Sequence, residues 1–65
     1  MQEFPIVSLT LMLTDDQAWA FAQLLKRIGF DDWRRLAVDD LEAYVMRSAC
    51  ELLRAELAHA GYAPR

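Results

Sequence analysis

The stretch Thr14–Phe30, TDDQAWAFAQLLKRIGF, contains both the start and the stop signal of one amphipathic helix. Thr14 is a helix N-cap type, and Gln17 follows it at the spacing of a capping box. Gly29 is the residue type that most often ends a helix, because it tolerates the left-handed backbone conformation there. The pattern therefore predicts a helix over Asp15–Ile28.

A second capping pattern follows, with Asp39 as the N-cap and Glu42 three residues later. Gly61 repeats the stop signal, so the expected helix runs over Asp40–Ala60. On a helical wheel its apolar residues fall on one arc. The arc contains Leu41, Val45, Met46, Ala49, Cys50, Leu52, Leu53, Leu57 and Ala60.

Upstream of both helices, Pro5–Leu13 alternates in the period-two manner of a β-strand and carries no charge. A lone strand leaves its backbone groups unpaired, so the strand needs a partner. Arg34–Val38, a second copy of the chain or a different protein are the three candidates. The stretch Asp31–Val38 fits a helical turn capped by Asp31 better than a second strand. We therefore expect an α+β fold, with an N-terminal β-strand followed by two α-helices (β-α-turn-α).

The length of 65 residues predicts a single domain over residues 1–65 with a small core. Such a core needs very efficient helix packing, or a second copy or partner that completes it. The apolar run lacks the basic flank of a signal peptide and is too short to span a membrane. A single cysteine fits a reducing cytoplasm, so we expect a cytoplasmic protein with no membrane partner.

Residues suited to catalysis are scarce in this sequence. His59 is the single histidine, in the last turn of a predicted helix, where a cation is favoured. Cys50 is the single cysteine and falls within the apolar arc. No glycine-rich phosphate loop or metal-ligand spacing is present, so we expect no cofactor, no metal and no enzymatic activity.

The most visible charge feature is a set of acidic residues at the predicted helix starts. Capping and the helix dipole are sufficient to explain them. Together they would also form a negative surface able to dock on a basic groove that normally holds nucleic acid. Trp33 is either an interface anchor beside them or a core residue. The predicted partner-binding set is Asp15, Asp16, Asp31, Asp32, Trp33, Asp39, Asp40 and Glu42.

Glu56 falls inside the apolar arc, where a lone buried carboxylate is costly. Two arrangements avoid that cost. Either Glu56 pairs with Arg34 or Arg35, or that end of the arc is open to solvent or to a partner.

Three stretches, Leu13–Phe30, Ala37–Ala49 and Leu57–Arg65, resemble small proteins carried by plasmids, integrative elements and phages of proteobacteria. The resemblance implies a mobile-element protein that acts by contact with a host protein. An anti-CRISPR-type inhibitor would fit the size and the acidity. Its target would be a host nucleic-acid-binding defence protein, such as a Cas subunit with a basic groove.

The alternative interpretation is a ribbon–helix–helix DNA-binding dimer, such as a repressor or an antitoxin. In that family the polar strand residues read the DNA major groove, which would assign Ser8 and Thr10 here. The predicted strand, however, has no lysine, arginine, asparagine or glutamine, and the net charge of the chain is −3. Affinity for DNA rests largely on cationic phosphate contacts, so direct nucleic-acid binding is not expected.

Overall fold

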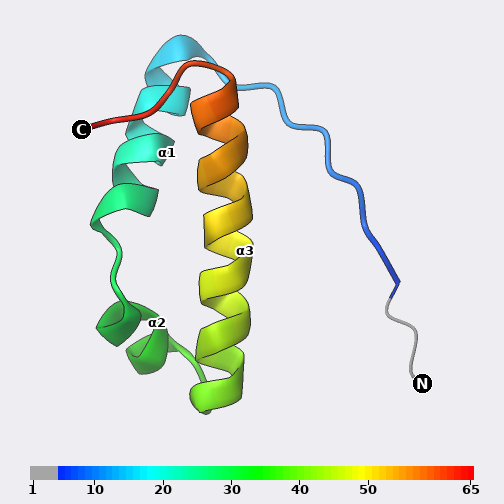
Figure 1. Cartoon of the computed structure of the whole chain (residues 1–65), viewed down its shortest axis with the longest axis vertical. Coiled ribbons are helices and arrows are strands. Elements are labelled where there is room, and N and C mark those ends of the chain that lie inside the picture. Colours follow the sequence, from blue (N-terminus) through cyan, green and yellow to red (C-terminus); the bar gives the residue numbers. More distant parts are fainter. Residues whose placement is uncertain (1–4) are drawn as a thin grey trace.

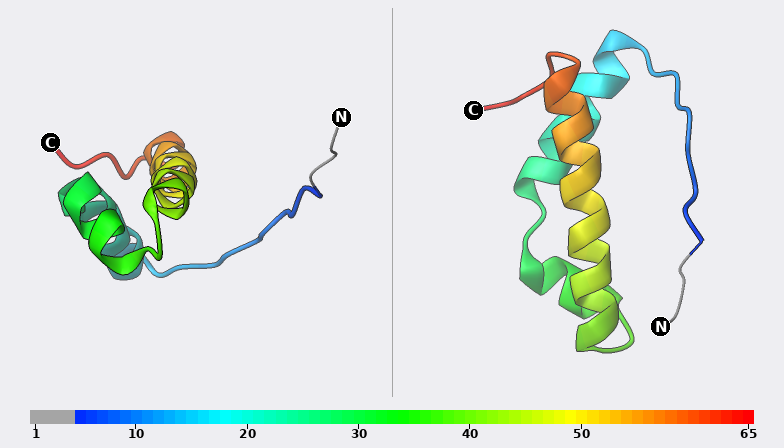
Figure 2. Two further views of the ribbon diagram at one scale, coloured as in Figure 1. Left: turned by 90° about the horizontal axis from the view of Figure 1, so that it is seen from below. Right: turned by 45° about the vertical axis from the view of Figure 1, so that its right-hand side comes forward.

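The computed structural model describes residues 5–65 and contains three helices in that range. They are α1 (Asp15–Arg27), α2 (Phe30–Leu36) and α3 (Asp40–His59). Helices α1 and α2 follow one another along the same side of the longer α3, and both pack on it (Figure 1). Pro5–Leu13, called the N-terminal segment below, runs away from the helices as an extended chain (Figure 2).

The capping box predicted at the start of α1 is confirmed. The backbone N–H of Gln17 donates to the Thr14 hydroxyl at 3.1 Å. The Gln17 side chain in turn accepts from the Thr14 N–H at 3.0 Å. The helix ends at Arg27, one residue before the predicted end, because Ile28 turns to extended backbone with ψ 132°.

Helix α2 forms in the stretch for which the sequence allowed two alternatives, a helical turn or a second strand. It begins at Phe30, and the N–H of Gly29 donates to the Asp32 carboxylate at 2.8 Å. Asp32 rather than Asp31 therefore satisfies the free backbone group at this helix start. The alternative second strand at Arg34–Val38 is wrong, since α2 continues to Leu36.

Helix α3 begins as predicted after Asp39, whose carboxylate accepts from the Glu42 N–H at 2.8 Å. It ends at His59, and Gly61 follows with a φ of 101°, in the left-handed region. The N–H of Tyr62 then donates back to the Leu57 carbonyl at 2.8 Å. Gly61 therefore stops α3 by the expected glycine mechanism. Gly29 has a φ of −117°, so it does not use that mechanism.

The predicted α+β fold is wrong, because residues 5–65 contain no strand. The N-terminal segment has the alternation of a strand, but a strand exists only when another strand accepts its hydrogen bonds. Within the chain, the candidate partner strand was Arg34–Val38, and most of that stretch belongs to helix α2. Over the residues described, the regular secondary structure of this small domain is therefore α-helix alone.

The buried core is very small and lies where α1 and α2 pack on α3. It consists of Ala18, Ala22 and Leu25 from α1 and Ala43 from α3. Three of these four side chains are alanines, which let the helices approach closely but bury little apolar area. Two aromatic pairs flank this core, Phe30 with Tyr44 and Trp19 with Tyr62, each with ring centroids 5.0 Å apart.

Candidate functional site

Helix α3 has two apolar faces rather than the single arc that the sequence predicted. Met46, Cys50 and Leu57 are half-buried on the side that packs against the other helices. Leu41 and Leu52, in contrast, are 73% and 70% exposed. The helical wheel places these two residues opposite the packed side. The single-arc prediction is therefore wrong, because it joined side chains that point in different directions.

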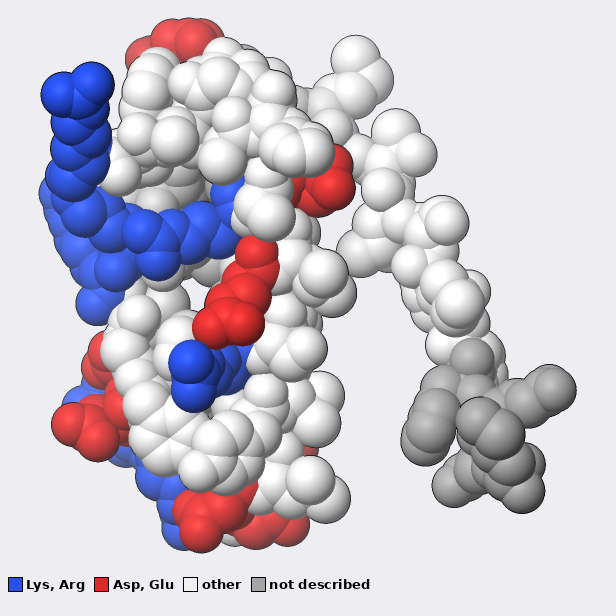
Figure 3. Space-filling model, in the orientation of Figure 1, with Lys and Arg blue, Asp and Glu red and all other residues white. Residues whose placement is uncertain are grey.

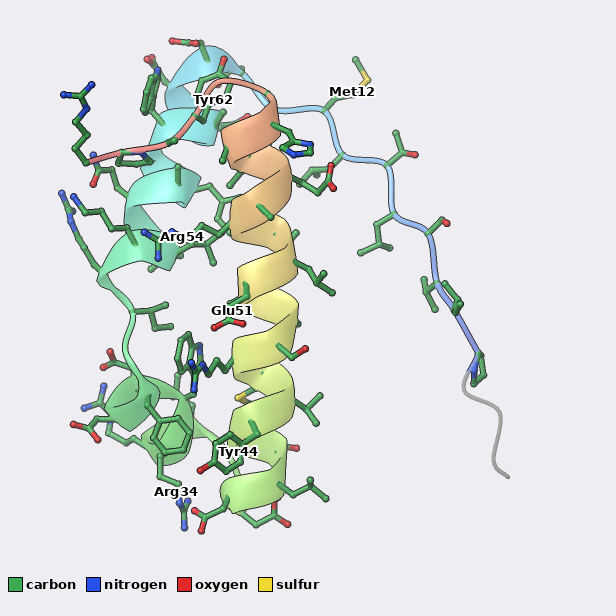
Figure 4. All side chains as sticks on the ribbon, viewed as in Figure 1. Met12, Arg34, Tyr44, Glu51, Arg54 and Tyr62 are labelled. Atoms are coloured by element: carbon green, nitrogen blue, oxygen red, sulfur yellow. The ribbon has the colours of Figure 1, made fainter. Side chains whose placement is uncertain are left out.

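The second apolar face is called the outer face of α3 below. It comprises Leu41, Val45, Ser48, Leu52, Ala55 and His59. These positions alternate in steps of four and three residues, which aligns them along one side of a helix. None of them is an aspartate, glutamate, lysine or arginine. Side chains of α3 project towards the side on which the N-terminal segment runs (Figure 4).

The N-terminal segment is even more exposed than the outer face. Ile6, Leu9 and Met12 are 93%, 84% and 91% exposed. Within residues 5–65, no backbone hydrogen bond involves the segment. A gap separates it from α3 in the space-filling view (Figure 3). Apolar side chains and unpaired backbone groups therefore coincide in one stretch of nine residues.

A groove of about 550 Å³ lies where the N-terminal segment approaches the ends of α1 and α3. Apolar side chains from all three parts of the chain line most of it. They include Leu9, Leu11 and Leu13 from the segment, Phe21 from α1, and Leu53 and Leu57 from α3. The groove thus adds apolar side chains at the C-terminal end of α3 to those of the outer face.

Glu56 is exposed and contributes the one charged side chain of that groove. The predicted ion pair with Arg34 or Arg35 is wrong, because Arg34 pairs with Asp40 and Arg35 pairs with Asp32. The alternative, an arc open at this end, is confirmed. Glu56 avoids the cost of burial because the groove is not covered.

Five of the seven predicted acidic site residues interact within the chain. Asp39 and Glu42 accept backbone N–H groups at the start of α3. Asp32 accepts from Gly29 and from Arg35, the latter at 2.9 Å. The remaining contacts join Asp40 to Arg34 and Asp15 to Tyr62. Capping and local pairing therefore account for most of the acidic pattern.

The structure divides these carboxylates between two ends of the molecule. Asp15 and Asp16 lie at the start of α1, whereas the other five lie around α2 and the start of α3. The 13 residues of α1 separate the two groups by about 20 Å. Figure 3 shows acidic atoms at both ends, with basic atoms among them at the α2 end. The predicted single negative surface is thus two separate clusters.

Trp33 lies in α2 and is half-buried. Its indole Nε1 is buried and has no hydrogen-bond partner within the residues described. An interface anchor presents its polar edge to a partner, whereas this edge is turned inward. The geometry thus favours the core interpretation of Trp33.

The side chain of Tyr62 closes the top of the molecule, where the end of the chain returns to α1. Its hydroxyl donates to Asp15 at 2.7 Å, and its ring forms a T-shaped pair with the ring of Trp19. The hydrogen bond to Asp15 raises the pKa of Tyr62, with smaller contributions from desolvation and the carboxylate charge. Figure 4 shows Tyr62 over the start of α1.

Residues suited to catalysis are not brought together. His59 lies exposed in the last turn of α3, and Cys50 is half-buried two turns earlier. Within the described part of the chain, no group of three or more histidine, cysteine, aspartate or glutamate residues is placed to bind a metal ion. None of the helices in residues 5–65 has the length and apolar character needed to cross a bilayer.

The candidate site is therefore an exposed apolar surface, formed by the outer face of α3, the groove and the N-terminal segment. Sequence reasoning missed Leu41, Val45 and Leu52 as site residues. One signal in the sequence could have identified them. Positions of α3 spaced by four and three residues have no charged side chain, although they lie on a different side of the helix from the packed residues.

Over residues 5–65, these features define a small helical domain with an exposed apolar surface. The chain belongs to the family of unknown function DUF7706, whose model matches residues 1–65. Neither the curated proteins nor the solved structures contain a protein that matches it.

Proposed function

We propose that this protein is a non-enzymatic interaction module, which works by burying its apolar surface against another polypeptide. The observation that carries this proposal is the exposure of large apolar side chains on two neighbouring elements. Leu41 and Leu52 of α3 and Leu9 of the N-terminal segment are all at least 70% exposed. Monomeric soluble proteins rarely expose a contiguous apolar patch of this kind unless it meets a partner.

The total surface of the chain supports the same conclusion. A compact monomer of 7.5 kDa exposes about 4,200 Å². This chain exposes 5797 Å², which is more by about 1,500 Å². Its radius of gyration is 13.4 Å, whereas a compact chain of this length has about 11 Å. A partner that covers this surplus supplies the apolar burial that the four-residue core lacks.

The test of this proposal is affinity capture from host cells, with the full chain as bait and two leucine variants for comparison. Leu52→Asp places a charge on the outer face of α3. Leu36→Asp is a matched control, because Leu36 is 69% exposed but lies on α2. We expect one protein to be captured by wild type and Leu36→Asp and lost with Leu52→Asp. Equal capture by all three chains would contradict the proposal.

The resemblance to mobile-element proteins extends the proposal to a host target, a nucleic-acid-binding defence protein with a basic groove. The observation in favour is that five acidic residues gather around α2 and the start of α3. Asp31 is the residue to change there, since no hydrogen bond or ion pair occupies it within residues 5–65. Asp31→Lys should weaken binding to such a target, whereas Asp16→Lys, at the other end of α1, should not. Equal effects of the two changes would reject a docking role for this cluster.

A DNA-binding regulator is the weaker candidate. The N-terminal segment, which would have to enter the DNA groove, contains no lysine or arginine. Basic atoms gather instead beside the C-terminal half of α1, away from the segment (Figure 3). Phosphate contacts would therefore be missing where that function needs them.

A further inference from the structure

We infer that a second copy of this chain covers the apolar surface, in a two-fold symmetric dimer that buries the outer face of α3 and the N-terminal segment of both copies. The inference rests on the proposed function, since it names the partner of the same surface. Four properties of that surface favour a second copy over an unrelated protein.

The first property is length. The 20 residues of α3 rise about 30 Å, and the nine residues of the N-terminal segment span about 30 Å when extended. The segment of one copy is therefore long enough to cover the whole outer face of α3 in the other. Two chains that exchange such contacts form a closed pair, because the same patch is used on both sides.

The second property is charge. Each copy has a net charge of −3, so the net electrostatic interaction between two copies is repulsive unless the contact surface avoids the acidic residues. The residues from Pro5 to Thr14 are uncharged, and so is the outer face of α3. Two copies that meet on this surface therefore oppose no aspartate, glutamate, lysine or arginine side chains there, and the surface is also strongly apolar.

The third property is the state of the backbone in the N-terminal segment. Its N–H and C=O groups have no backbone partner within residues 5–65, so burial against a smooth apolar surface would leave them unsatisfied. The same segment of the second copy offers a complementary set of donors and acceptors when the two run antiparallel across a two-fold axis. Contact between the two segments would thus avoid the free-energy cost of burying unsatisfied backbone N–H and C=O groups, which burial against most other surfaces would impose.

The fourth property is area. The surplus of about 1,500 Å² per chain amounts to about 3,000 Å² for two copies. Obligate homodimers bury roughly 2,000–5,000 Å² in total. The surplus surface therefore has the size that a stable dimer needs. It also fits a domain of 65 residues that has no disulfide and, among the described residues, no large side chain that is fully buried.

Sedimentation equilibrium of the full chain tests the inference. Wild type should sediment as a dimer of about 15 kDa, twice the 7.5 kDa of the chain, at micromolar concentration. Leu52→Asp should raise the dissociation constant at least tenfold, because symmetry places the new charge in the interface twice. Leu9→Asp, in the N-terminal segment, should do the same without touching α3. Leu36→Asp should leave the dissociation constant unchanged, and far-UV circular dichroism should show the same helix content in all four chains.

A wild-type chain that stays monomeric at ~100 µM would overturn the inference. So would dimers of Leu52→Asp and Leu9→Asp as stable as that of Leu36→Asp. A monomeric wild type whose captured partner is lost with Leu52→Asp would refute the dimer and leave the proposed function standing. A dimer broken by Leu52→Asp, with capture of other proteins unaffected, would support the dimer and refute the use of this surface to bind a different protein.

Discussion

The hydroxyl of Tyr62 donates a 2.7 Å hydrogen bond to the carboxylate of Asp15, 47 residues earlier in the chain. This contact joins the end of the chain to the first turn of α1. Beside this hydrogen bond, the rings of Tyr62 and Trp19 form a T-shaped pair. The contact thus holds the ends of α1 and α3 together beside the groove, so it positions part of the proposed binding surface.

Titration of Tyr62 should therefore weaken the fold at high pH. A raised pKa means that the folded state favours the neutral phenol, which is the form that donates to Asp15. This stabilisation is fully present below the ordinary tyrosine pKa of about 10 and is lost as the pH rises through the higher pKa of the folded state. We expect the free energy of unfolding to decrease above a pH of about 10.

Ultraviolet titration of tyrosinate checks this, in a Tyr44→Phe background that leaves Tyr62 as the one tyrosine. Asp15→Ala should lower the Tyr62 pKa, because it removes the acceptor. Asp16→Ala is the matched control, since it removes a neighbouring carboxylate that does not accept from Tyr62. Identical titration curves for the two variants would refute a role of Asp15 in the shift.

Exchange of the two glycines for alanine should have unequal effects. Gly61 has a φ of 101°, where a side chain is strained, so Gly61→Ala should destabilise the fold by about 1 kcal/mol. Gly29 has a φ of −117°, and a Cβ there would lie at an ordinary 3.8 Å from the Asp32 carboxylate. Gly29→Ala should change stability by less than about 0.5 kcal/mol, measured by urea denaturation. A larger loss for Gly29→Ala would contradict this assignment.

Removal of the N-cap of α1 should lower the stability of the fold more than the same substitution at a threonine that caps no helix. Thr14→Ala removes the acceptor for the Gln17 N–H and should cost about 1 kcal/mol of unfolding free energy. Thr10 lies exposed in the N-terminal segment and caps no helix. In thermal melts at a protein concentration low enough to keep the chain monomeric, Thr10→Ala should therefore have little effect on the midpoint. Equal midpoints for the two variants would show that the capping box does not stabilise α1.

Truncation of the one large core side chain should be the most damaging leucine change. Leu25 is 6% exposed, and Leu25→Ala should cost at least about 2 kcal/mol, because it removes buried methyl groups and leaves a cavity. Leu36→Ala, at a 69% exposed position, should stay within about 0.5 kcal/mol. Chemical denaturation at fixed protein concentration compares them. A tolerated Leu25→Ala would mean that the core lies elsewhere.

Local signals in the sequence predicted the local structure well. The caps at Thr14 and Asp39 and the glycine stop at Gly61 depend on residues within a few positions of one another. The predicted strand was wrong because strand formation depends on a distant partner, which alternation within Pro5–Leu13 does not reveal. The helical turn predicted at α2 is present, but its cap was predicted wrongly. The side chain of Asp32, rather than that of Asp31, accepts the backbone N–H at the helix start.

The candidate site was harder to predict than the helices. The acidic residues were visible in the sequence, yet most of them serve caps and ion pairs. The outer face of α3 was hidden because Leu41 and Leu52 merged with the packed residues into one broad arc. Which part of a wide arc is buried depends on how much surface the neighbouring helices cover, and the short α1 and α2 cover little of it.

Hydrogen exchange of the backbone amides in Pro5–Leu13 is the most direct test of the central claim, that the apolar surface is covered by another chain. At low protein concentration these amides should exchange at the rate of an unfolded peptide, since they have no backbone partner within residues 5–65. At concentrations where a second copy binds, they should become protected, and Leu52→Asp should abolish this protection while Leu36→Asp preserves it. Unprotected exchange at every concentration up to ~100 µM would contradict the account.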